Sequence, residues 1–181
     1  MISFLTLFLF DILLGFVPQA AGCAICLFAL AKQPIKSKSF LFTAGIFSAI
    51  AIGVRLICNY GLIDFGFHTI LIWLIFVIVA LTYNKFPIMQ CTVGILISVL
   101  SIFLTEAVAA LVLTLILGSE QFNAIMDNTS TIEGQITRAI YGIPMNILFV
   151  IVALMIYFIL DRRAKRIAAR AAEGQVEETE N

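Results

Sequence analysis

The chain has 181 residues, of which 62% are hydrophobic and 12% charged, and its formal net charge at pH 7 is zero. With a mean hydropathy of +1.10 it is far too apolar for a soluble globular domain, and no nucleic-acid partner is expected. Its charges lie between and after the apolar runs, so their positions carry more information than their sum.

Five apolar runs have adequate or nearly adequate length for membrane spans, since about 20 helical residues cross a hydrocarbon core of about 30 Å. They are residues 3–31, 39–60, 67–83, 88–117 and 139–160. The predicted fold is an all-α, polytopic helical membrane protein. A transmembrane bundle covers residues 1–160, and residues 161–181 form a cytoplasmic basic helix followed by a disordered acidic tail.

The first run contains Pro18, which predicts a kink. A signal peptide ending near Cys23 is an alternative, but no Lys or Arg precedes residue 32 and apolar sequence continues past Cys23, so a retained helix is favoured. Cys23 and Cys26 form a C-x-x-C pattern. Dithiol chemistry is one interpretation, and packing of two small apolar side chains is the favoured one.

The basic residues follow alternate runs, and this pattern predicts the orientation. They are Lys32, Lys36 and Lys38 after the first run, Lys85 after the third, and Arg162, Arg163, Lys165, Arg166 and Arg170 after the last. Because Lys and Arg concentrate on the cytoplasmic side, we expect the N-terminus outside and the C-terminus inside. Loops 32–38 and 84–87 are then inside, and loops 61–66 and 118–138 are outside.

The fourth run would reach about 45 Å as one helix, which exceeds the hydrocarbon thickness. A hairpin at Thr105 and Glu106 would make six spans and place the C-terminal basic cluster on the opposite side from the other lysines. That arrangement violates the positive-inside rule, so five spans are predicted.

The last helix is expected to begin near Thr131, with Ser130 and Glu133 forming a capping box. We expect it to pass the interruptions at Gly142 and Pro144, to continue beyond the membrane and to end at Gly174. Its basic residues would contact anionic head groups or a cytoplasmic partner.

Ionisable groups within a membrane cost about 2.5–3.5 kcal/mol each on insertion scales and therefore mark candidate sites. Arg55 and Glu106 fall at about the same predicted depth, near the outer interface. With Asp64 and His68 they would outline an outward-facing ligand pocket; a structural Arg–Glu pair is the alternative. Asp11 is a deeper carboxylate, suited to a helix–helix hydrogen bond or to a proton or cation site.

No complete catalytic constellation can be assembled from these residues. His68 is the sole histidine, which excludes a two-histidine zinc helix, and a Cys58–His68 dyad lacks a third orienting group. We therefore expect no enzyme activity, no metal and no cofactor.

Three stretches resemble the multi-span membrane sensor regions of Gram-positive histidine kinases of the quorum-sensing and sporulation-regulation type. They are Gly66–Leu71, Glu106 within the long fourth helix, and Gly142–Pro144, and the resemblance covers most of residues 40–160. Residues 161–181 carry no phospho-acceptor histidine and no ATP-binding motif. The resemblance therefore implies a detached sensor or accessory signalling subunit whose tail contacts a partner.

The first hypothesis is thus a ligand-sensing membrane protein in which the last helix passes a displacement to the basic tail. The alternative is a small-solute transporter, or the substrate-binding membrane subunit of one, with Asp11 and Glu106 as its functional carboxylates. Assembly as a homo-oligomer is open under both.

Overall fold

The computed structural model describes residues 15–59, 67–127 and 131–179, and the regular secondary structure of these residues is all helical, without strands. The helices are α2 (Val17–Leu30), α3 (Lys38–Asn59), α4 (Phe67–Thr82), α5 (Ile88–Leu117), α6 (Ser119–Asp127) and α7 (Ile132–Thr179). The all-α prediction is confirmed.

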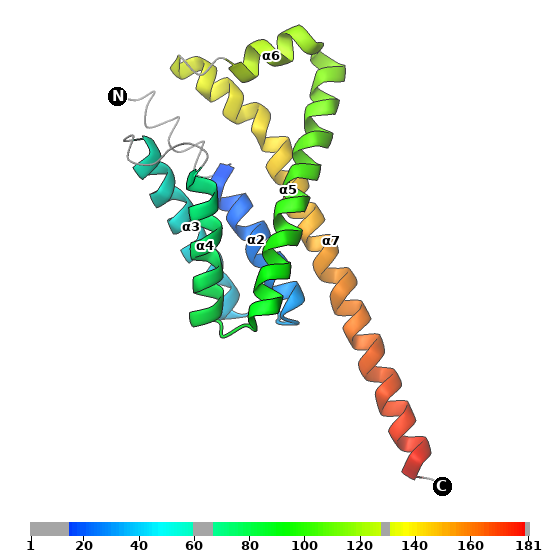
Figure 1. Cartoon of the computed structure of the whole chain (residues 1–181). Coiled ribbons are helices and arrows are strands. Elements are labelled where there is room, and N and C mark those ends of the chain that lie inside the picture. Colours follow the sequence, from blue (N-terminus) through cyan, green and yellow to red (C-terminus); the bar gives the residue numbers. More distant parts are fainter. Residues whose placement is uncertain (1–14, 60–66, 128–130, 180–181) are drawn as a thin grey trace.

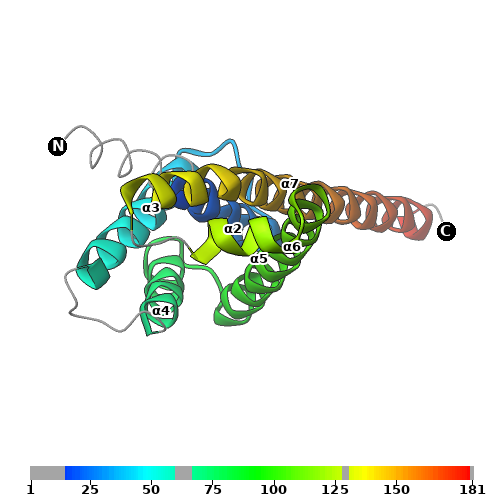
Figure 2. The same cartoon turned by 90° about the horizontal axis from the view of Figure 1, so that it is seen from above.

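Helix α2 is the centre of the bundle and contacts α3, α5 and α7 (Figures 1 and 2). Alanine, glycine and cysteine make up much of its sequence, and residues 22–29 are all buried. Small side chains let neighbouring helix backbones approach closely, and a helix that is apolar on every side is suited to such a central position.

Two glycines mark the closest approaches to neighbouring helices. A Cβ atom at Gly22 of α2 would overlap the ring of Phe149 on α7. A Cβ atom at Gly94 of α5 would lie 2.8 Å from Leu27 Cδ2 and 3.3 Å from Leu27 Cα. Both contacts therefore need the absence of a side chain.

Helix α5 has an inward face of small and hydroxylic residues and an outward face of large apolar ones. The buried residues are Cys91, Gly94, Ser98, Ser101, Thr105 and Ala109, and outward ones include Leu96, Leu100, Phe103, Leu104, Leu111 and Leu115. The buried hydroxyls donate within the helix, Ser98 to the Gly94 carbonyl at 2.8 Å and Thr105 to the Ser101 carbonyl at 2.9 Å. This inside-out distribution is typical of a helix surrounded by hydrocarbon.

Within the described residues, two helical segments are long and apolar enough to cross a membrane, Ile88–Leu117 and Ala139–Ile167. Val17–Leu30, Lys38–Val54 and Thr69–Thr82 are shorter apolar helices. Because α5 is one continuous helix of 30 residues, the hairpin alternative at Thr105 and Glu106 does not occur.

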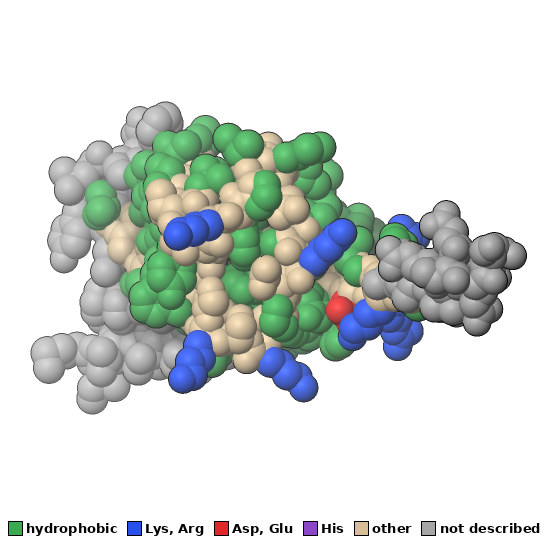
Figure 3. Space-filling model, turned by 90° about the horizontal axis from the view of Figure 1, so that it is seen from below, with side chains coloured by type: hydrophobic (Ala, Val, Ile, Leu, Met, Phe, Trp, Pro, Cys, Tyr) green, Lys and Arg blue, Asp and Glu red, His purple; other side chains and the backbone are tan. Residues whose placement is uncertain are grey.

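The connections that follow α2 and α4 lie at the same end of the bundle, and Figure 3 shows Lys and Arg side chains spread over this face. Lys32 (φ 53°) and Lys85 (φ 55°) both adopt the left-handed conformation. After α2, the Gln33 amide donates to the Phe28 carbonyl at 2.9 Å and the Lys32 amide to the Ala29 carbonyl at 3.3 Å. This pair of bonds is a Schellman motif, whose left-handed position is usually glycine.

A polar clamp holds the lower end of α3 to the α4–α5 connection. The Asn84 amide donates to Thr43 Oγ1 at 3.0 Å, and Asn84 Oδ1 accepts from Ser39 Oγ at 2.8 Å. The Thr43 side chain is fully buried. The clamp therefore satisfies a polar group that is inaccessible to water.

We expect Asn84→Ala to destabilise the protein by about 0.6–2 kcal/mol, the range for hydrogen bonds between membrane helices. Thermal unfolding of the purified protein in detergent measures this loss. Asn123→Ala, at an exposed position of α6, is the control and should have no effect. Equal stability of the two variants would show that the clamp contributes nothing.

Several local predictions differ from the structure. The predicted loop 118–138 contains α6, which was not foreseen, whereas the start of α7 at Ile132 agrees with the helix start predicted near Thr131. Helix α7 does not end at Gly174 but continues to Thr179, because the flanking Ala, Glu and Gln residues offset one glycine that costs about 1 kcal/mol. The expected disordered tail is therefore helical as far as residue 179.

Two further local predictions concern Pro18 in α2 and the capping residue of α7. Pro18 lies in the first turn of α2, which directly follows Gly15 and Phe16 in π-helical conformation. At the start of α7 the Gly134 amide donates to Thr131 Oγ1 at 3.1 Å, so Thr131 is a capping residue. Ser130, the predicted cap, lies outside the described residues.

Candidate functional site

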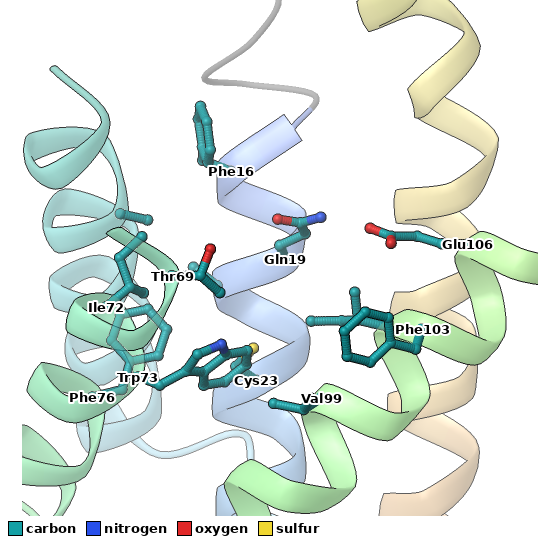
Figure 4. Close-up of a pocket in the computed structure, with 13 residues that line it drawn as sticks. Phe16, Gln19, Cys23, Thr69, Ile72, Trp73, Phe76, Val99, Phe103 and Glu106 are labelled. Carbon is teal, nitrogen blue, oxygen red and sulfur yellow. The ribbon is translucent and has the colours of Figure 1, made fainter. Parts of the chain in front are cut away.

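A cavity of about 340 Å³ lies in the half of the bundle away from the lysine-bearing connections, between α2, α3, α4 and α5 (Figure 4). It is lined by Phe16, Gln19, Ala20, Cys23, Ala51, Thr69, Ile72, Trp73, Phe76, Val99, Ile102, Phe103 and Glu106. Helices α4 and α5 meet at their short connection and separate toward the other end (Figure 1). The cavity occupies the space that this divergence leaves in front of α2.

The floor of the cavity is apolar and well supported. Trp73 and Phe76 of α4 contact edge to face, with ring centroids 5.9 Å apart. Phe76 in turn stacks on Phe47 of α3 at 3.9 Å, and both of these phenylalanines are buried. The floor is therefore anchored to the core and does not depend on the connecting segments.

The polar groups are gathered at the mouth. Gln19 of α2 and Glu106 of α5 point toward each other across it, and Thr69 of α4 lies on the opposite side of α2 from Glu106 (Figure 4). Among the described side chains, none forms an ion pair with Glu106. The site thus combines an apolar interior with a carboxylate and an amide at its opening.

Glu106 is the residue of the predicted ligand pocket that the structure shows lining the cavity. Arg55 lies on α3, one turn after the lining residue Ala51, and His68 directly precedes the lining residue Thr69. The described side chains do not include those of Arg55 and His68. Asp64 and Asp11 also lie outside the described residues, so the predicted Arg55–Glu106 pair stays a prediction.

Gln19, Thr69 and Trp73 line the pocket but were not predicted as part of it. The predicted pocket was based on charged residues within apolar runs and did not include neutral polar ones. Gln19 did carry a signal, because it lies four residues before Cys23 and thus on the same helical face, inside a predominantly apolar run.

The described cysteines pack inside the helical bundle. Cys23, Cys26 and Cys91 are free and buried. Cys23 contributes to the pocket wall, and Cys26 packs in a small cluster with Ile25 and Ala153 of α7. Within residues 15–59, 67–127 and 131–179, no group of three or more His, Cys, Asp or Glu residues could hold a metal ion.

The basic residues after the last apolar run all lie exposed on α7, at Arg162, Arg163, Lys165, Arg166 and Arg170. Lys165 Nζ lies 2.7 Å from Asp161 Oδ2, one helical turn away. The hydrogen bond to this carboxylate raises the pKa of Lys165. The cation is therefore retained at neutral pH, and the contribution of the pair is lost only as the pH rises through the folded-state pKa.

No protein-family model, curated protein or solved structure matches the chain.

Proposed function

We propose that the chain is a multi-pass cell-membrane protein with five spans, its N-terminus outside and its C-terminus in the cytoplasm. In this proposal the cavity binds a ligand from the outer side, and α7 transmits its occupancy to the basic cytoplasmic helix. Support for the orientation comes from the two lysine-bearing connections at one end and from α6, with Glu120 and Asp127, at the other.

The observation that carries the sensing role is the double contact of α2. Ala20 and Cys23 line the cavity, whereas Gly22 packs directly against Phe149 of α7. Because no space separates Gly22 from the Phe149 ring, a ligand that displaces α2 also displaces α7. Close-packed interfaces of this kind shift between discrete arrangements and do not deform continuously.

Helix α7 is suited to carry such a displacement over a distance. It is one helix of 48 residues that extends past the rest of the bundle (Figure 1). Arg166 follows Phe149 by 17 residues, or about 25 Å along the axis at 1.5 Å per residue. A small tilt at Phe149 is therefore amplified at the basic cluster, where a signalling partner would bind.

Filling the cavity should imitate a bound ligand. We expect Val99→Phe, on the α5 wall, to change the distance between spin labels at Lys36→Cys and Arg166→Cys by about 2 Å or more, as for helix shifts in known switches. Double electron–electron resonance in lipid nanodiscs measures this distance, in a background in which the four native cysteines are replaced by serine.

Val108→Phe is the matched control, because Val108 lies on the same helix, is 43% exposed and does not line the cavity. It should leave the distance unchanged. Identical distance distributions for wild type and a monodisperse Val99→Phe protein would contradict the sensing role. Gradient-dependent solute uptake by the protein in liposomes would favour the transporter hypothesis instead.

A further inference from the structure

We propose that the cavity binds a cationic amphiphile, a molecule with an ammonium head and a short apolar tail. This inference rests on the proposed ligand-binding role and specifies the chemistry of the ligand. The juxtaposition behind it is the Glu106 carboxylate facing Gln19 at the mouth of an apolar, aromatic cavity (Figure 4).

The lining residues indicate that the head group of the ligand is positively charged. Among the described side chains that line the cavity, Glu106 is the one acidic residue and none is Lys, Arg or His. A carboxylate in apolar surroundings is unfavourable unless a cation or hydrogen-bond donors accompany it. An ammonium group beside the Glu106 carboxylate would supply both, whereas an anionic head group would be repelled.

Aromatic rings add a second attraction for a cation. Phe16 lies above Gln19, and Phe103 and Trp73 lie below the level of Gln19 and Glu106 (Figure 4). Aromatic ring faces attract ammonium groups, and the attraction is stronger where water is excluded. The rings also exclude a strongly hydrated ligand, so an inorganic cation alone would fit this site less well.

The tail of the ligand follows from the volume and the position of the opening. The cavity of about 340 Å³ is at the lower end of the range for small-ligand sites, and its floor is formed by apolar side chains. Thr69 and Phe103 are exposed, so within the described part of the chain the cavity opens to the side of the bundle between α4 and α5. In a membrane, this side faces lipid, where an amphiphile concentrates.

Trp73 permits a direct binding test because it is the single tryptophan of the chain. The probe is 10-bromodecylammonium, whose bromine quenches indole fluorescence on contact, added to the full chain in nanodiscs of unbrominated zwitterionic lipid. We expect saturable quenching of Trp73 at concentrations at least about tenfold below those needed for 10-bromodecanol or 10-bromodecanoate.

Variants of Glu106 test whether its carboxylate causes the preference for the ammonium probe. Glu106→Gln should raise the half-saturating concentration of the ammonium probe about tenfold or more, whereas Glu106→Asp should keep it within a few-fold of wild type. Glu120→Gln is the matched control, since it removes the same charge from an exposed position on α6 that does not line the cavity.

Non-saturable quenching that is equal for the three probes would overturn the inference, as would tighter binding of the decanoate. The outcome is separable from that of the sensing role. Saturable, Glu106-dependent binding without any change in the 36–166 label distance would keep the ligand class and reject sensing. A change of the 36–166 label distance in Val99→Phe, without binding of the ammonium probe, would keep the sensing role and reject the ligand class.

Discussion

Gly22→Val is expected to lower the melting temperature of the protein in detergent by about 2–12 °C. The new side chain would occupy the position of the Phe149 ring, so α2 and α7 must separate or Phe149 must leave its rotamer. Overpacking of this kind costs about 1–3 kcal/mol, and each kcal/mol corresponds to about 2–4 °C for a chain of this size. Thermal unfolding followed by size-exclusion chromatography gives the measurement.

Gly45→Val provides the control, because a Cβ atom at Gly45 of α3 meets no other atom within 4 Å. Gly45→Val should be neutral or slightly stabilising, since valine is a better helix former than glycine. Gly22→Val combined with Phe149→Ala should recover part of the loss by removing the colliding ring. Equal destabilisation by both single variants would show that glycine itself, and not the contact with Phe149, matters.

The helix positions were largely predictable because apolar length is a local property of the sequence. Predicted residues 39–60, 67–83 and 88–117 correspond to α3, α4 and α5, whose bounds differ by at most one residue. Helix α6 was missed because its nine residues form no long apolar run. Phe122, Ile125 and Met126 do recur at helical spacing and lie partly buried, which was the available signal.

The candidate site was less predictable because it depends on which helix faces meet. Glu106 could be found from its charge inside an apolar run. The position of Gln19 opposite Glu106 requires α2 to lie at the centre of the bundle, and hydropathy does not specify that position. The small residues of α2, such as Gly22 and Ala24, indicate close packing but do not name the neighbouring helices.

The proposed topology leads to an all-or-none labelling pattern in intact cells. A membrane-impermeant maleimide should label Asp127→Cys on α6 from outside, but Lys36→Cys and Arg166→Cys only after permeabilisation, in the serine-substituted background. These positions are exposed, so a failure to label reflects sidedness and not burial. Labelling of Arg166→Cys in intact cells would contradict the cytoplasmic position of the C-terminal helix.

The two left-handed lysines allow the cause of this orientation to be tested apart from the fold. Glycine adopts the left-handed conformation without the cost of about 1–2 kcal/mol that other residues incur, so Lys32→Gly and Lys85→Gly should keep both turns. With Lys36→Gln and Lys38→Gln added, the inner connections lose all four charges. Because lysine and arginine set orientation, the fraction of Asp127→Cys labelled from outside should fall. Full outside labelling of this quadruple variant would assign the orientation to the arginine-rich segment after the last span alone.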